Sequence, residues 1–139
     1  MIVVDSSAII AILLDEPDAA AFRGVLASAS DAHISAVTSY EIRTVAFSRG
    51  RERLLEEYEL LFAAASLTIA AFDAQQSLLA FEGFRRWGKG IHPAGLNFGD
   101  CAAYALAKSL DAPLLFKGED FARTDVRRAL SSPTSSRRT

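Results

Sequence analysis

The sequence has one cysteine, two histidines and no long uninterrupted apolar run, and each scarcity excludes a class of protein. Cys101 alone forms neither an intramolecular disulfide nor a cysteine-based metal site, which is typical of a reducing cytosol. The apolar run from Ala8 to Leu14 is far shorter than the roughly 20 residues that a membrane-spanning helix needs. The N-terminus also lacks the basic segment of a secretory signal. We therefore expect a cytoplasmic protein that does not associate with membranes.

Basic residues are not in excess either, since 15 Lys and Arg face 17 Asp and Glu, for a formal net charge of -2. Any contact with nucleic acid must therefore depend on a local basic patch. Half of the 139 residues are hydrophobic, which is enough for one buried core. We predict a single domain over residues 1–130. Residues 131–139 are rich in Ser, Thr and Arg and cannot bury an apolar face, so they are predicted to form a flexible C-terminal tail.

Short apolar runs alternate with helical patterns along the chain. The candidate strands are Ile2 to Val4, Ala32 to Ser35, Leu67 to Ile69 and Pro113 to Phe116. This alternation predicts an α/β fold with three layers, in which a parallel sheet of four to five short strands lies between helices. Residues that follow the carboxyl ends of such strands gather at one edge of the sheet, where ligands bind.

The stretch from Leu96 to Ala107 is the most informative in the chain. Asn97 suits the N-cap of a helix that has no polar side chain except tyrosine between Cys101 and Ala107, so the helix is predicted to be buried. Asp100 falls in its first turn, where capping alone explains an acid. Its charge would also lie at the edge of a core. Cys101 fits a buried core position better than a nucleophile.

Two further acids directly follow predicted strands. Asp5 comes after the first strand, and capping of the next helix is better served by Ser6 or Ser7, which favours a functional role for Asp5. Asp120 comes shortly after the last strand, with Glu119 beside it as a substitute that points elsewhere. Both aspartates are predicted to lie at the carboxyl edge of the sheet.

Two more acids have strong structural explanations. Glu41 ends the segment Thr38-Ser39-Tyr40-Glu41, which matches a capping box, so capping and a site role are equally open for it. Asp73 begins a helix that continues to Trp87 with an apolar stripe, and it lies several residues beyond a strand. Ordinary capping is the favoured explanation for it, and a site role is the less favoured alternative.

Carboxylates that converge need a counter-charge. Two of them about 5 Å apart repel by roughly 3 kcal/mol at an effective dielectric constant of 20. A divalent cation neutralises such a group, and ligands that are all oxygen select Mg²⁺ or Mn²⁺ over zinc.

The segment from Arg85 to Gly95 combines cations, an aromatic residue, a histidine and three glycines. Such residues hold phosphates and stack on unpaired bases, which suits single-stranded nucleic acid. Trp87 also falls on the apolar stripe of its helix, so a core position is favoured for it. A catalytic role for His92 is the less favoured interpretation.

Four motifs, in this order, resemble the PIN-domain nucleases and, within them, the VapC toxins of bacterial toxin–antitoxin pairs: Ile2 to Ala8, Glu41, Leu96 to Cys101, and Leu115 to Phe121. Together they cover nearly the whole chain. The resemblance implies a PIN-like fold and a metal-binding catalytic set of Asp5, Glu41, Asp100 and Asp120. Asp5 and Asp100 would be the most direct ligands, with Ser6 and Asn97 in support.

The same resemblance implies a function and its partners. The protein would be an endoribonuclease toxin that depends on Mg²⁺ or Mn²⁺, cleaves RNA, forms a homodimer and is neutralised by a cognate VapB-like antitoxin. Phe22, Val25 and Leu26 are candidates for the antitoxin's docking groove.

Two alternatives remain at this point. One is a catalytically silent PIN-like module that binds RNA or protein, which four intact acids argue against. The other is a phosphoacceptor signalling domain that would use Lys117, but such a domain needs an acidic pair where this chain has Asp5-Ser6-Ser7.

Overall fold

The computed structural model describes residues 1–130 and contains a four-stranded parallel sheet in the order β3-β2-β1-β4. Its strands are β1 (Ile2–Val4), β2 (Ala32–Ser35), β3 (Thr68–Ala70) and β4 (Leu114–Leu115). The predicted α/β fold with a parallel sheet of four to five short strands is confirmed, with four strands within residues 1–130. The predicted tail, residues 131–139, lies outside the described residues.

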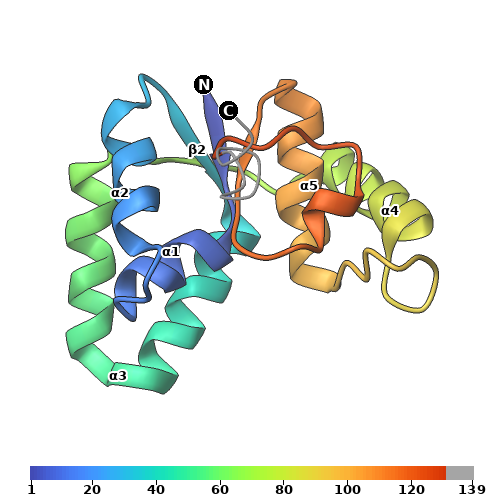
Figure 1. The fold of residues 1–139 in the computed structure, drawn as a ribbon. Coiled ribbons are helices and arrows are strands. Elements are labelled where there is room, and N and C mark those ends of the chain that lie inside the picture. Colours follow the sequence, from blue (N-terminus) through green and yellow to red (C-terminus); the bar gives the residue numbers. More distant parts are fainter. Residues whose placement is uncertain (131–139) are drawn as a thin grey trace.

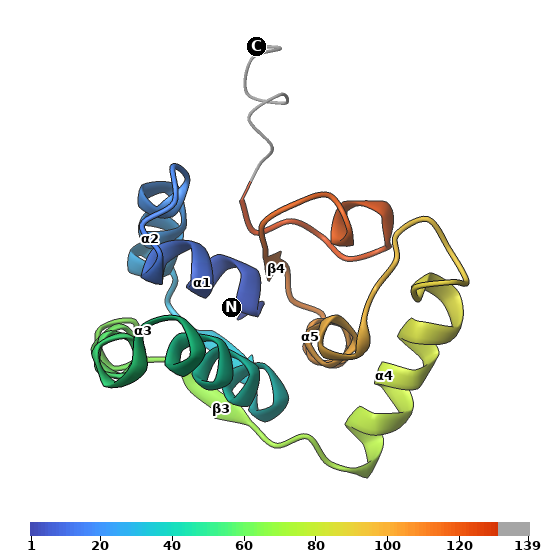
Figure 2. The ribbon, with the colours of Figure 1, turned by 90° about the horizontal axis from the view of Figure 1, so that it is seen from below.

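The described helices form a layer on each side of this sheet. Figures 1 and 2 show one group of helices on each side of the sheet. The first group is α1 (Ser6–Leu13), α2 (Ala19–Ser28) and α3 (Ala36–Ala64), and the second is α4 (Ala74–Trp87) and α5 (Phe98–Leu110). A short 3₁₀ helix, η1 (Phe121–Arg123), follows β4. Within residues 1–130, no helix is both long and apolar enough to cross a membrane.

The central strand β1 divides the core into two parts, because side chains alternate across a sheet. Ile2 and Val4 pack with α1, α2 and α3, whereas Val3 packs with α5. All three residues are buried, so β1 is covered on both faces. This explains why the strand is continuously apolar and why the first polar residue after it, Asp5, marks its end.

Helix α3 is a hairpin of two helical halves rather than one straight rod. Arg51 breaks it with φ 53° and ψ -140°, and Figure 1 shows the halves running in opposite directions. The hydroxyl groups of Ser39 and Tyr58, one from each half, are hydrogen-bonded at 2.8 Å. Gly50, a residue typical of helix C-termini, directly precedes the break, but the positive φ falls on Arg51 itself.

Candidate functional site

Asp5 lies where β1 ends and α1 begins, and it is almost fully buried. Its backbone N–H donates to the Leu115 carbonyl at 2.9 Å, which continues the pairing of β1 with β4. Its Oδ2 accepts a hydrogen bond from the Ser7 N–H at 3.0 Å, so Asp5 caps α1 itself and the expectation that Ser6 or Ser7 is the cap is wrong. Within residues 1–130, the other oxygen, Oδ1, is buried without a hydrogen-bond partner. Capping therefore uses only half of this carboxylate.

Glu41 takes no part in capping α3. The helix begins at Ala36, and the Ser35 hydroxyl caps it by accepting from the Val37 N–H at 3.2 Å. The capping-box interpretation of Thr38 to Glu41 is therefore wrong, because these residues lie inside the helix. Glu41 instead reaches across to the start of α5, where its carboxylate lies directly over Gly99.

Asp100 belongs to a complete capping box at the start of α5. The Asn97 N–H donates to Asp100 Oδ2 at 2.9 Å, and the Asp100 N–H donates to Asn97 Oδ1 at 2.8 Å. Asn97 as the N-cap is thereby confirmed. The box accounts for Oδ2 of the carboxylate, and the half-buried Asp100 is repelled by the charges of Asp5 and Asp120. Capping and a role in a site are compatible here.

Asp120 lies at the start of η1 with its side chain exposed and not engaged in capping. Gly118, with φ +96°, turns the chain after β4 in a backbone region that favours glycine. Glu119 is exposed and contacts Arg128 at 3.7 Å, so it points away from the acids, as the sequence predicted.

Mutual repulsion identifies these four acids as one electrostatic group. Burial, together with the charge of Glu41, raises the pKa of Asp5 to about 6, although hydrogen bonds from Ser6 and Ser7 oppose the rise. Burial likewise raises the pKa of Asp100 to about 6, with added repulsion from Asp5 and Asp120. The pKa of Glu41 is raised by burial and by Asp100, although a hydrogen bond from Ser6 opposes this. None of the ion pairs formed within residues 1–130 includes any of these four acids.

The donor set fits a hard divalent cation. All four side chains offer carboxylate oxygens, and the unpartnered Oδ1 of Asp5 is a buried acceptor that a cation would satisfy. Across residues 1–130, no three His, Cys, Asp or Glu side chains are gathered tightly enough to hold an ion as they stand. Mg²⁺ does not require such a cage, because it usually keeps several water ligands and binds one or two carboxylates.

The other acid that the sequence singled out is purely structural. Asp73 caps α4, with its Oδ1 accepting from the Gln76 N–H at 2.9 Å.

Lys117 Nζ contacts Glu16 at 2.8 Å and Asp18 at 3.2 Å. Lys117 is therefore engaged in ion pairs with the turn before α2. It is not available as the lysine that a phosphoacceptor site would need.

Cys101 is buried on the apolar side of α5, and burial raises the pKa of its thiol to about 11. A thiol with so high a pKa is not a nucleophile at neutral pH. Its predicted role as a core residue is confirmed.

The basic segment before α5 is closed by backbone hydrogen bonds from Lys89 N–H to the Leu96 carbonyl and from Leu96 N–H to the Trp87 carbonyl. Trp87 is half-buried and packs against the core. Its ring meets His92 edge-on at 4.8 Å between centroids, and Arg86 covers it at 5.0 Å. These contacts support the core interpretation of Trp87 and leave little of its ring for a base.

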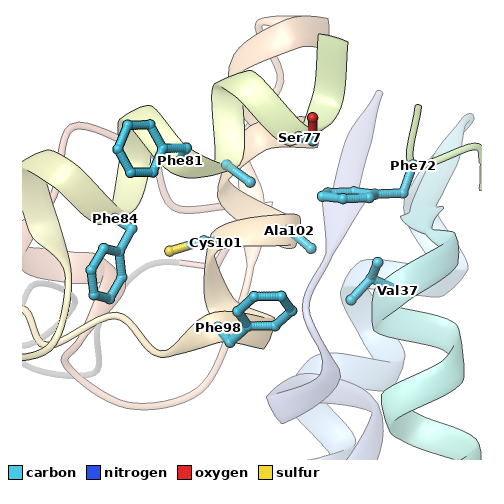
Figure 3. A pocket seen from close by; sticks show the side chains of 9 residues that line it. Val37, Phe72, Ser77, Phe81, Phe84, Phe98, Cys101 and Ala102 are labelled. Carbon is cyan, nitrogen blue, oxygen red and sulfur yellow. The ribbon is translucent and has the colours of Figure 1, made fainter. Parts of the chain in front are cut away.

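An apolar pocket of about 320 Å³ lies between α4, the start of α5 and the start of α3, and the sequence did not reveal it. Figure 3 shows Phe81 and Phe84 of α4 facing Phe98 of α5 across it, with Val37 of α3 on the far side. Phe98 precedes Gly99 and Asp100 and is 90% exposed. The signal in the sequence was the apolar stripe of α4, which indicates a covered face but not what covers it.

A second groove, of about 380 Å³, lies between α1, α2 and the second half of α3. Leucine and isoleucine side chains line it together with one cation and one anion: Ile12, Leu13, Arg23, Glu57, Leu60, Leu61 and Ala64. Phe22 and Leu26 are buried in the core, so their assignment to a docking surface is wrong, whereas Val25 is half-buried and its assignment stays a prediction. The helical periodicity identified their shared face but not that α1 and α3 already cover it.

Residues 2–127 match the family model of the PIN domain. The chain is 47% identical over 124 residues to a ribonuclease VapC of Mycolicibacterium smegmatis, covering 89% of this chain and 96% of that protein. It is 43% identical over 129 residues to ribonuclease VapC28 of Mycobacterium tuberculosis, covering 92% of this chain and 97% of that one.

Solved structures share the fold. VapC20 of Mycobacterium tuberculosis, a toxin that cleaves the sarcin-ricin loop, superposes with a TM-score of 0.74 at 16% identity, covering 91% of this chain and 96% of that one. A Rickettsia felis VapBC2 complex bound to a promoter DNA fragment gives 0.70 at 17% identity, covering 92% and 96%. At such identities the structures support the fold alone.

Proposed function

Because the chain belongs to the PIN-domain family and, within it, to the VapC ribonuclease toxins of toxin–antitoxin systems, we propose that Asp5, Glu41, Asp100 and Asp120 form its catalytic centre. The observation that carries this proposal is the unpartnered Oδ1 of Asp5, which is buried at the end of β1, repelled by Glu41, and part of a group in which Asp5 and Asp120 both repel Asp100. A group of this kind costs stability unless it is used to hold a cation.

The cation that we propose is Mg²⁺ or Mn²⁺, held most directly by Asp5 and Asp100. When bound, it supplies Lewis-acid activation of the scissile phosphate. Ser6 and Asn97 orient the acids, since Ser6 hydrogen-bonds Glu41 and Asn97 fixes the first turn of α5. Glu41, whose pKa is raised by burial and by Asp100, is the acid that we propose accepts a proton from the attacking water, and Asp120 is the exposed alternative.

RNA is the proposed substrate, and the cytoplasm is where we propose that the protein acts on it. Support comes from the ribonuclease relatives, which match about 90% of this chain. The test incubates the purified protein with single-stranded and hairpin RNA in Mg²⁺, in Mn²⁺ and in excess EDTA. Cleavage that requires the metal is expected. Undiminished cleavage in EDTA would contradict the proposed metal, and RNA binding without cleavage in any metal would favour a silent binding module.

A cognate antitoxin of the VapB type is the proposed protein partner, since structures of VapBC complexes share this fold. We assign its docking to the groove between α1, α2 and α3. The exposed Leu60 borders this groove, and Arg23 and Glu57 provide polar contacts among apolar ones. These features suit an amphipathic segment with one apolar face.

A second copy of the chain is the proposed partner of the other apolar surface, formed by α4 and the start of α5. There Phe98, which is 90% exposed, lines one pocket together with Phe81 and Phe84, so a projecting ring and a hollow share one face. Such a face is self-complementary and suits a two-fold symmetric dimer. The dimer would bring the acids of both copies close to the shared interface.

A further inference from the structure

Gly99 occupies the second position of α5, between the exposed Phe98 and the acid Asp100. It has a helical backbone, and its φ does not fall in the positive region that other residues avoid. Alanine is a better helix former than glycine by up to about 1 kcal/mol. Backbone conformation therefore does not explain a glycine at this position.

The space above Gly99 offers an explanation. A Cβ added there would lie 2.9 Å from Glu41 Oε1 and 3.1 Å from both Glu41 Cδ and Oε2. These three atoms are the whole carboxylate, which therefore lies against the bare backbone of the first turn of α5. A Cβ added at Gly24, within α2, would meet no atom within 4 Å.

A side chain at position 99 would change where the Glu41 carboxylate lies, but it would not change the fold. The obstructing atoms belong to the end of a flexible side chain, so a methyl group at this position would displace the Glu41 carboxylate without disturbing a backbone. Asp100 is held separately by its capping box with Asn97 and would stay in place. The separation between Glu41 and Asp100 would therefore change while both elements remained folded.

We propose that Gly99 is a positioning residue, whose missing side chain seats the Glu41 carboxylate on the first turn of α5 and sets its position relative to Asp100. The proposal rests on the proposed function for its catalytic consequence. The contact between position 99 and the Glu41 carboxylate involves only residues of this chain, so it is the same with or without metal.

The metal-dependent arm compares Gly99→Ala with Gly24→Ala, which makes the same chemical change in a helix with open space. Gly99→Ala is expected to lower RNA cleavage roughly tenfold to a hundredfold, the effect of misplacing a catalytic group by about 1 Å. It should also reduce the rise in melting temperature that Mn²⁺ produces. Gly24→Ala should retain both. If Gly99→Ala cleaves RNA and responds to Mn²⁺ as the wild type does, the proposal is overturned.

The metal-free arm measures melting temperatures in EDTA for wild type, Gly99→Ala, Glu41→Ala and the double variant. Removing the Glu41 side chain removes the clash, so Gly99→Ala should raise the melting temperature by about 1 to 3 °C more in the Glu41→Ala background than in wild type. Equal shifts in the two backgrounds would overturn the steric claim. A wild type that neither binds Mn²⁺ nor cleaves RNA would contradict the proposed function instead, and the metal-free arm would still decide the role of Gly99.

Discussion

Asn97 and Asp100 each accept a hydrogen bond from the other's backbone N–H, at 2.8 and 2.9 Å, so one carboxylate both caps α5 and carries a charge into the acidic group. Asp100→Asn separates these roles. Asn is nearly isosteric and still accepts from the Asn97 N–H, so the capping contribution of about 1 kcal/mol should largely remain. The metal-free variant should melt at or above the wild-type temperature, because repulsion from Asp5 and Asp120 is relieved.

With Mn²⁺ present, Asp100→Asn should show no RNA cleavage and little of the metal-induced stabilisation of wild type. Thermal melts in EDTA and in Mn²⁺, beside one cleavage assay, make the comparison. A variant that melts well below wild type in EDTA and still cleaves RNA would mean that Asp100 is only a cap.

The pH dependence of stability should be opposite in the metal-free and metal-bound proteins. In the folded protein the pKa of Asp5 and of Asp100 is about 6, above the value of 3.8 for a free carboxyl. Between these values the folded state binds more protons than the unfolded state, so stability is fully present below about pH 4 and is lost as the pH rises through 6. Other groups titrate there too, so the decisive comparison is with Asp100→Asn.

We therefore expect wild type in EDTA to be more stable at pH 5 than at pH 7.5, by about 1 to 3 kcal/mol, and Asp100→Asn to show a smaller difference. With saturating Mn²⁺ the wild type should instead gain stability toward pH 7.5, since the ion binds the ionised carboxylates. Urea unfolding at both pH values measures this. The same slope in wild type and Asp100→Asn would show that the pKa of Asp100 is not raised.

Most of the acids at the carboxyl edge of the sheet were predicted from the sequence, because a buried strand is an apolar run that ends where a polar residue follows. The apolar run of β1 ends at Asp5, and the Asn97 box at α5 was correctly identified. The box expected at Glu41 failed because Ser35, three residues before Thr38, is an equally good cap, and sequence spacing does not decide between two caps one turn apart. The sequence did not predict that the Glu41 carboxylate lies against Gly99, because this contact depends on how α3 and α5 pack.

The apolar surfaces were harder to predict for a related reason. Helical periodicity indicates that a face is apolar but not what lies against it. Phe22 is covered by neighbouring helices, whereas Phe81 of α4 remains exposed beside the pocket.

The proposed dimer surface predicts an oligomeric state that one substitution changes. Phe98→Ser removes the projecting aromatic ring without touching the core, so the monomer should stay folded while the dimer dissociates at micromolar concentration. Leu60→Ser is the matched control, because Leu60 is 72% exposed on the opposite helical layer. Sedimentation velocity measures both variants. A Phe98→Ser protein as dimeric as wild type would exclude this surface.

The domain proposal predicts that residues 131–139 are dispensable. Their composition offers no apolar face, and the PIN-domain match ends at residue 127. A chain ending at residue 130 should therefore melt within about 2 °C of the full chain and cleave RNA equally well. A larger fall in melting temperature would mean that the removed segment packs on the domain.

The loop that carries Asp120 is tied down at Asp125, which gives a last prediction. Asp125 Oδ1 accepts from the Tyr104 hydroxyl at 2.9 Å and its Oδ2 accepts from Lys108 Nζ at 3.0 Å, so the loop is fixed to α5. Partial burial tends to raise the pKa of Asp125, but these two hydrogen bonds and the nearby cations lower it overall. The anchored carboxylate is therefore ionised at neutral pH.

Asp125→Ala should lower the free energy of unfolding by about 1 to 3 kcal/mol, because it leaves Tyr104 and Lys108 without their acceptor. It should also weaken metal-dependent cleavage more than the stability loss explains, since Asp120 lies five residues earlier on the same loop. Glu119→Ala is the control: it removes an exposed acid next to Asp120 whose ion pair with Arg128 is long at 3.7 Å. Cleavage measured well below both melting temperatures separates the effects. Equal cleavage by the two variants would mean that the Asp125 anchor stabilises the fold without positioning Asp120.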